Sequence, residues 1–369
     1  MKHPTARLGT TGLVIALALL TGCTDGGTPP PDGAAPQASS GPQPVITTDD
    51  AKQVFARYDR ENAAADAALD DVAASKIQTG VLLKESLAGY EIHRKAGTED
   101  EAAHLTRPRF LIPAEEAGAP YPRSFAVLSK WKGSEKDRSS SLLYFTQAEK
   151  GGAWKADAAG WAVTEPAKTS ASASPTPSPA PSKKDDTAVR VQPKVLPDIR
   201  RTPSETAQLS DTSQADREVC DSYADYLSFT SPLGSPTDDR FAEGGFTSDL
   251  VRFYNDWADS GLGHTFSYRV TGAGLPVFRL STGSSLVACT LEQEHRTTGA
   301  PPTGTVRYDK GSDTDLLLGG GGRQWRSVDQ TSSLTALIEV PTQKTRAATV
   351  LACDCYDPQL LSATGARSG

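Results

Sequence analysis

The sequence lacks any hydrophobic run long enough to cross a membrane as a helix. Its clearest apolar stretch, residues 13–20, falls far short of the roughly 20 residues that a membrane-spanning helix needs. Basic residues are also in the minority, because 38 Lys and Arg stand against 45 Asp and Glu and give a formal net charge of −7. This balance argues against nucleic acid or an anionic lipid surface as the main partner.

Motifs for catalysis, metal binding and nucleotide binding are missing as well. The glycines at 319–322 are not followed by the Lys-Ser/Thr of a phosphate loop, and residues 282–286 hold only one glycine of a nucleophile elbow. No two histidines of the exported part have the spacing of a metal-binding pair on a helix: His93, His104, His264 and His295. We expect no metal, no cofactor and no catalytic residue, and we interpret each histidine as structural.

The N-terminus has the order of a secretory signal. Lys2 and Arg7 precede the apolar residues 13–20, and small residues follow before a cysteine, in Leu20-Thr21-Gly22-Cys23. These four residues resemble the lipobox of bacterial lipoproteins, which implies cleavage after Gly22 and diacylglycerol on the Cys23 thiol. The alternative is an ordinary secretory signal that happens to contain a cysteine.

A lipid on Cys23 would decide where the protein resides. Two acyl chains hold a protein on a membrane stably, since each buried methylene contributes about 0.8 kcal/mol. Loss of Lys2 and Arg7 leaves 36 basic and 45 acidic side chains, a net charge of −9. We therefore expect an exported, acidic chain that is anchored by its lipid to the outer face of the cytoplasmic membrane.

The chain has 26 prolines and 32 glycines, which are too many for one compact fold, so linkers are expected. Residues 1–22 read as the signal peptide, and the Gly, Pro and Ala that follow predict a disordered tether over 23–44. The Ser/Pro-rich residues 166–209 predict a second linker between an N-terminal lobe, 45–165, and a C-terminal lobe, 210–365. Its Thr-Pro and Ser-Pro pairs suit a bare spacer or a site for O-linked sugars.

Both lobes show helical spacing first and strand-like alternation afterwards. In the first lobe we expect helices near 48–72, with Thr48 at the N-cap, and 75–94, then strands at 110–112, 125–131, 142–146 and from 154. In the second lobe we expect helices near 219–227 and 250–257, then strands at 266–270, 277–280, 286–291, 306–308, 334–340 and 348–355. The fold class is α+β, with helices followed by an antiparallel sheet in each lobe. The shared order suggests an internal duplication, although it is also a common order.

Four cysteines follow Cys23, and an even number in an exported chain favours disulfides. The candidates are Cys220, Cys289, Cys353 and Cys355. A Cys220–Cys289 bridge would join a predicted helix to a predicted strand. Cys353 and Cys355 could pair if the strand bulges, or one of them could reach Cys289 instead. A redox or metal site at Cys353-Asp354-Cys355 is the less favoured interpretation, because structural zinc needs a second pair.

Two resemblances extend this picture. The helical opening and Lys150-Gly151-Gly152-Ala153-Trp154-Lys155 make the first lobe similar to cone-shaped folds of the nuclear-transport-factor-2 type. From about residue 45 to the end, the chain resembles an actinobacterial family of secreted lipoproteins known only as a domain of unknown function. The stretches that carry this second resemblance are 53–58, 220–227, 286–290 and 360–365. It implies no activity.

Aromatic residues at helical spacing are the remaining candidates for a site. Tyr223, Tyr226, Tyr254 and Trp257 either pack in the core or line a pocket between helices and sheet. We favour a non-catalytic binding or interaction protein of the cell envelope, whose partner is an envelope protein or a small ligand. The alternative is an enzyme that uses a Tyr or Asp in a cone-shaped pocket, and a transporter substrate-binding protein ranks third.

Overall fold

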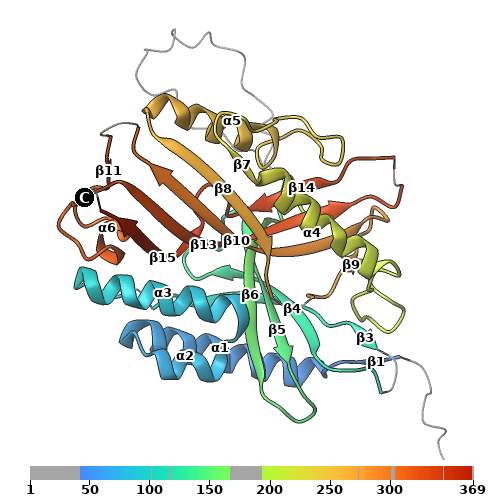
Figure 1. Ribbon diagram of the computed structural model, residues 1–369. Helices are drawn as coiled ribbons and strands as arrows, with labels where there is room; N and C mark the ends of the chain where they lie inside the picture. The colour runs from blue at the N-terminus through green and yellow to red at the C-terminus, as the bar shows by residue number, and fades with distance from the viewer. Residues whose placement is uncertain are drawn as a thin grey trace, which may run out of the picture. The chain divides into compact units, whose positions relative to one another are not determined.

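The computed structural model describes residues 42–100, 102–115, 118–166, 193–272, 274–300, 304–343 and 345–367, which belong to one compact unit. The signal peptide, Cys23, most of the expected tether and residues 167–192 of the expected linker lie outside the described residues. The described part combines helices with antiparallel sheets, which confirms the α+β class (Figure 1). No helix in these described ranges is both long and apolar enough to span a membrane.

The first half begins with helices and ends in a four-stranded antiparallel sheet of order β2-β4-β5-β6. A short strand pair, β1 with β3, lies beside it, so residues 43–44 of the expected tether are part of the fold. The bounds are α1 Thr48–Ala68, α2 Asp71–Ile77, α3 Gly80–Ala96, β1 Gln43–Pro44, β2 Leu105–Leu111, β3 Ala114–Glu115, β4 Arg123–Trp131, β5 Ser139–Gln147 and β6 Trp154–Val163.

Several helix boundaries differ from the prediction, two of them in ways that a local contact explains. The N-cap of α1 is Thr47, one residue earlier than expected, and its hydroxyl accepts the Asp50 backbone N–H at 3.1 Å. The expected second helix is broken before Gly80, whose φ of +57° lies in the left-handed region that favours glycine. A Cβ at Gly80 would lie 1.6 Å from Oδ1 of Asp157 on β6. The break therefore comes from close packing against the sheet, which helical periodicity does not reveal.

The second half has a larger antiparallel sheet of order β14-β13-β10-β8-β7, with β15 also pairing with β13 and β9 with β10. The helices are α4 Ser213–Leu227, α5 Ser248–Asp256, a 3-10 turn Trp257–Ser260 and α6 Asp313–Leu317. The strands are β7 Phe229–Thr230, β8 Gly263–Val270, β9 Phe278–Arg279, β10 Ser285–Thr298, β11 Val306–Arg307, β12 Gln324–Trp325, β13 Ser327–Val340, β14 Thr349–Cys353 and β15 Gln359–Ala366. Sequence periodicity did not predict β15.

Helix α4 crosses one face of this sheet (Figure 1). A disulfide joins Cys220 of α4 to Cys289 of β10, with their Cα atoms 5.3 Å apart. Cys353 and Cys355 are also joined, with Cα atoms 5.1 Å apart, because β14 ends at Cys353 and the chain turns there. The first bridge fixes α4 on the sheet that carries the candidate site.

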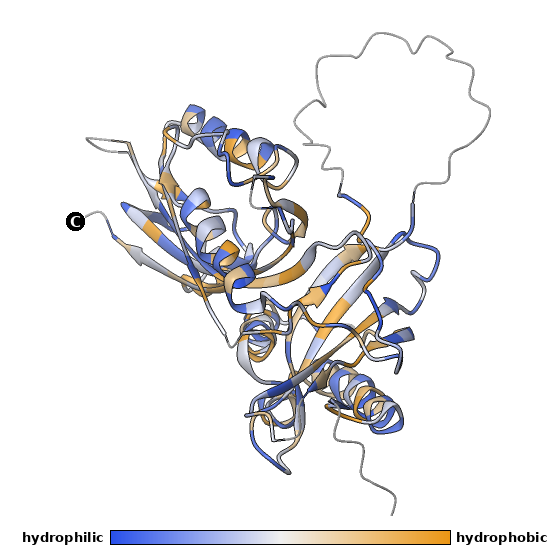
Figure 2. Cartoon of the chain, turned by 90° about the vertical axis from the view of Figure 1, so that its right-hand side faces the viewer, coloured by the Kyte–Doolittle hydropathy of each residue, from blue (hydrophilic) through white to orange (hydrophobic). Residues whose placement is uncertain are grey.

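The two halves share a hydrophobic core. One cluster joins Leu128, Leu142 and Tyr144 of the first sheet to Phe278 and Leu337 of the second. Figure 2 shows apolar stretches along the strands, interrupted by polar residues. Across the same junction, the Ser333 hydroxyl donates a hydrogen bond of 2.5 Å to Oε1 of Glu85 on α3.

Residues 193–209, which we expected in the linker, pack into that core. Leu196 and Ala207 are buried in the shared cluster, and the backbone bridges Val163↔Val195 and Pro113↔Ala207 reach the first half. Further bridges, Ile199↔Leu280 and Leu209↔Phe278, reach the second half. Because this segment is mostly polar and rich in proline, its few buried apolar residues did not stand out in the sequence. The ordered part therefore begins before Ser210, where we had expected it to start.

Candidate ligand-binding pocket

One face of the large sheet changes from apolar to polar along each long strand. On β10, every second residue points to this face. The first of them, Val287, Cys289 and Leu291, are apolar and pack under α4. The next are polar: Gln293, His295 and Thr297. On β13 the apolar Leu334, Ala336 and Ile338 are likewise continuous with the polar Ser332 and Gln330. Since residues two apart share a face, polar groups line the part of this face that α4 leaves uncovered.

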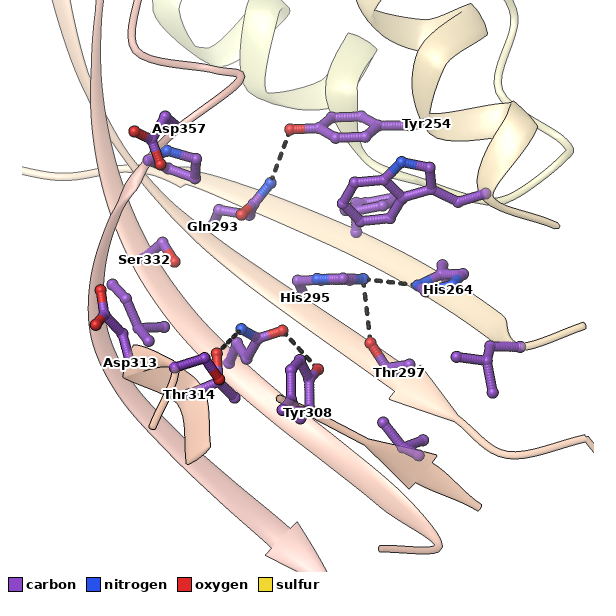
Figure 3. A pocket seen from close by; sticks show the side chains of 18 of the residues that line it. Tyr254, His264, Gln293, His295, Thr297, Tyr308, Asp313, Thr314, Ser332 and Asp357 are labelled. Carbon is purple, nitrogen blue, oxygen red and sulfur yellow. Dashed lines mark hydrogen bonds between the residues drawn. The ribbon is translucent and has the colours of Figure 1, made fainter. Parts of the chain in front are cut away.

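These polar groups line a cavity of about 740 Å³. Its walls come from the end of α5 and the 3-10 turn, from β8, β10 and β13, from α6, and from the chain between β14 and β15. Figure 3 shows the labelled side chains converging from these elements. They include Tyr254, His264, Gln293, His295, Thr297, Tyr308, Asp313, Thr314, Ser332 and Asp357. A volume of this size suits a small-molecule ligand.

A pair of histidines lies on the floor of the pocket. Nδ1 of His264 on β8 is 3.0 Å from Nε2 of His295 on β10, and the His295 ring is stacked on Phe266 with centroids 4.5 Å apart. Register explains the proximity, because Thr297 is directly opposite His264 and His295 opposite Phe266 in the β8–β10 ladder. Residues 31 positions apart are thereby brought into hydrogen-bond contact.

Both imidazoles favour the neutral form. Burial and the neighbouring His264 lower the pKa of His295 to about 3, and burial also lowers the pKa of His264. Only one proton can lie between two ring nitrogens, so one histidine donates and the other accepts. At neutral pH the floor is therefore uncharged.

A second network holds the polar side chains of the wall. The Tyr308 hydroxyl donates to Oε1 of Gln330 at 3.0 Å, and Nε2 of Gln330 donates to Oγ1 of Thr314 at 2.8 Å (Figure 3). Nε2 of Gln293 donates to the hydroxyls of Tyr254, at 3.5 Å, and Tyr268. These bonds fix the amides in one orientation and reduce the entropy that a ligand would have to overcome.

The structure separates the four aromatic residues proposed from the sequence. Tyr254 and Trp257 line the pocket. Tyr223 and Tyr226 lie in the core instead, where Tyr223 donates to the Phe246 carbonyl at 2.6 Å and Tyr226 to the Pro236 carbonyl at 3.0 Å. Helical spacing predicts all four on helices, and the structure places Trp257 in the 3-10 turn after α5, but this spacing does not show which helix borders a cavity.

His264 and His295 were not singled out as site residues by the sequence. A signal was present, because every residue along 293–297 is polar, whereas the alternate positions before them, Val287, Cys289 and Leu291, are apolar. His93 and His104 lie elsewhere, against Thr98 and Asp59 respectively. Among the described ranges, no group of three or more His, Cys, Asp or Glu side chains is arranged to hold a metal ion.

Comparison with known proteins places the chain in a family. Residues 42–357 match the family model described as Domain of unknown function (DUF8094), and the chain belongs to this family. No curated protein matches the chain. No solved structure matches it either.

Proposed function

We propose that this protein is an exported lipoprotein that binds a small ligand, without chemical turnover, in the pocket of its second half. The single observation that carries the proposal is the polar, partly aromatic cavity on one face of the large sheet, which elsewhere packs in the hydrophobic core. Filling these positions with apolar residues would stabilise the fold, since burying Gln293 and His295 has a desolvation cost. Polar residues retained at such positions indicate a binding role.

The lipid anchor supports an envelope location for this binding. The Leu20-Thr21-Gly22-Cys23 motif and the preceding apolar residues motivate attachment to the outer face of the cytoplasmic membrane. The antiparallel pairing of the named strands gives no support to a transporter substrate-binding protein, which we expected to need crossing strands between two α/β lobes. A small molecule, rather than an envelope protein, is the favoured partner because the polar groups are inside a concavity.

A ligand-observed NMR screen tests the binding role. The full-length chain, purified in detergent, would be screened against a library of uncharged and charged fragments. We expect several fragments to bind and to lose binding in Thr297→Trp, because an indole at this buried position fills the cavity beside His295. Fragments that bind both proteins equally, or that are chemically converted, would overturn the proposal.

A matched substitution separates blocking from unfolding. Thr290 is also buried on β10, but it does not line the cavity, so Thr290→Val keeps its shape and should leave fragment binding unchanged. If Thr297→Trp unfolds the chain, Ser332→Phe blocks the same cavity from β13. Both blocking variants should then reduce the same set of fragment signals.

An enzyme is the second candidate, because a hydrogen-bond chain leads from Ser260 to the histidine pair. Oγ of Ser260 is 3.4 Å from Nε2 of His264, whose Nδ1 meets His295. This order resembles a nucleophile, a base and a group that orients the base. However, Oγ of Ser260 also accepts the Leu262 backbone N–H at 3.2 Å, and Ser260 itself does not line the cavity.

Covalent labelling distinguishes the two candidates. A fluorophosphonate probe reacts with an activated serine, and the binding role predicts no more labelling of the wild type than of Ser260→Ala. Labelling of the wild type that Ser260→Ala and His264→Gln both abolish would favour the enzyme.

A further inference from the structure

The groups that the pocket leaves without partners specify the chemistry of its ligand. Gln293 and Ser332 are 4% and 5% exposed, and both line the cavity. Within the described residues, neither Oε1 of Gln293 nor Oγ of Ser332 has a hydrogen-bond partner. Neither atom is among the fully buried side-chain atoms that lack a partner, so both are open to the cavity and can bond a ligand there.

Apart from the Arg307 guanidinium at the exposed edge, the free groups are mostly acceptors. Oε1 of Gln293 can only accept, as can the carboxylates of Asp313 and Asp357 at the edge of the pocket. The Ser332 hydroxyl can both donate and accept. A complementary ligand must therefore present several donors, some of which also accept, and this is the pattern of a molecule rich in hydroxyl groups.

Charge in the pocket lies at its edge and not in its interior. Arg307, Asp313 and Asp357 line this edge and are exposed, so water screens their charges. The interior is formed by amides, hydroxyls and aromatic rings, together with the neutral histidine pair. Among the described residues, the one lining cation, Arg307, is at the exposed edge, and no charged side chain in the interior compensates the hydration that a charged ligand would lose there.

An aromatic ring offers a flat apolar surface beside these acceptors. Trp257 lines the cavity and is partly exposed, and none of the five rings that it contacts, at interplanar angles of 48° to 73°, is stacked parallel to the indole. The negative face of an indole attracts the slightly positive C–H bonds of an apolar ligand face. A ring with C–H groups on its face and hydroxyls on its edge matches both parts of the pocket.

We propose that the ligand is an uncharged saccharide of one or two sugar rings, stacked on Trp257 and hydrogen-bonded by its hydroxyls to Gln293 and Ser332. This inference rests on the proposed binding role of the same pocket. The cavity of about 740 Å³ lies within the 300–1,000 Å³ typical of small-ligand sites and limits the ligand to a short saccharide.

Calorimetric titration of the full-length chain in detergent tests the ligand class. The probes are glucose, galactose, N-acetylglucosamine, maltose and cellobiose, with glucuronate, glucosamine and adenosine as comparison ligands at the same millimolar concentrations. We expect at least one neutral saccharide to bind more tightly than every comparison ligand. Gln293→Met, which removes the acceptor at similar length, and Trp257→Ala should each weaken that binding about tenfold or more.

Trp131→Ala is the matched control, because Trp131 is 47% exposed and does not line this cavity. It should bind the saccharide like the wild type. Ser332→Ala repeats the test with a smaller change if Gln293→Met fails to fold. Saccharide binding that these pocket variants leave unchanged would overturn the inference.

The outcomes also separate this inference from the binding role. Tight binding of glucuronate, glucosamine or adenosine alone would overturn the saccharide class and leave a ligand-binding pocket. No binding by any probe would also overturn the saccharide class, while the fragment screen with Thr297→Trp decides the binding role independently.

Discussion

At the scale of single residues, His295 shows how the pocket is linked to stability. Its ring is stacked on Phe266 and hydrogen-bonded to His264, and its pKa is lowered to about 3 from the ordinary 6.5. Between these two values the unfolded chain binds a proton that the folded chain does not. The contribution of His295 to the free energy of unfolding is therefore complete above about pH 6.5 and is lost progressively as the pH falls.

Replacement of His295 should reduce the acid sensitivity of the fold. From pH 7 to pH 5, this titration alone removes about 2 kcal/mol from the free energy of unfolding, at roughly 1.4 kcal/mol per pH unit. We expect His295→Gln to lose less stability than the wild type over this range in urea denaturation. His93→Gln, at a histidine outside the pocket that contacts Thr98, is the comparison variant. Equal losses in all three proteins would show that His295 does not carry the effect.

At the scale of secondary-structure elements, packing between elements decides where helices begin and end. The period of 3.6 predicts helices near α1, α3, α4 and α5, and the period of two predicts strands near β4 and β5. The break before Gly80 could not be predicted, because it depends on Asp157, which lies 77 positions later. β15 was missed because its residues are only partly buried and show little apolar contrast.

The Gly80 position gives a direct test of this packing. Gly80→Ala should destabilise the chain by about 2–4 kcal/mol, since it combines a positive φ with a Cβ 1.6 Å from Asp157. Gly97→Ala shares the positive φ, at +68°, and meets no atom within 4 Å, so about 1 kcal/mol is expected. Chemical denaturation measures both values. A cost for Gly80→Ala no larger than for Gly97→Ala would contradict the close approach of α3 and β6.

The bridge between α4 and β10 should also contribute to stability. Replacing Cys220 and Cys289 with serine opens a loop of 69 residues, for which loop entropy predicts a loss of about 4 kcal/mol. The same change at Cys353 and Cys355, which are two positions apart, should cost less by this mechanism. Denaturation midpoints of the two double variants provide the comparison, and a larger loss for Cys353 and Cys355 would exclude the entropic explanation.

The candidate site was only half predictable from such patterns. Tyr254 and Trp257 stand out by helical spacing, and both reach the cavity. Gln293 and His295 reach it through the antiparallel register of β8 and β10, which the sequence does not specify. Long-range register is set by the whole sheet, so the sequence shows that this strand changes from apolar to polar but not what the polar side chains face.

At the scale of the whole molecule, the described halves fold around a shared core. In the cluster described above, Phe278 and Leu337 of the second half pack with Leu142 and Tyr144 of the first. Leu196 and Ala207, in the segment that leads into the second half, belong to the same cluster. The halves should therefore depend on each other for stability, despite the low-complexity sequence between them.

Cutting the chain between the halves tests this dependence. A specific protease site inserted within residues 167–192 should permit cleavage, and the two fragments should remain together in gel filtration under native conditions. The buried cluster predicts association without a covalent link, because burying apolar area stabilises the complex. Fragments that separate and remain folded would contradict the shared core.

The proposed membrane anchor also concerns the whole molecule. Cys23→Ala removes the thiol that the lipobox resemblance assigns to the lipid, and we expect the chain to move from the membrane fraction to the soluble fraction. Fractionation followed by immunoblotting measures the change. Cys220→Ala, which leaves the lipobox intact, should stay with the membrane. A Cys23→Ala protein that remains in the membrane fraction would contradict lipid anchoring.

A crystal structure of the chain grown with its best-binding fragment or saccharide tests the binding role most directly. We predict density for the ligand against Trp257, within hydrogen-bond distance of Gln293 and Ser332. Density in the smaller cavity of about 300 Å³ beside Glu85 and Asp354, with the Trp257 pocket filled by its own side chains, would contradict the assignment of the site.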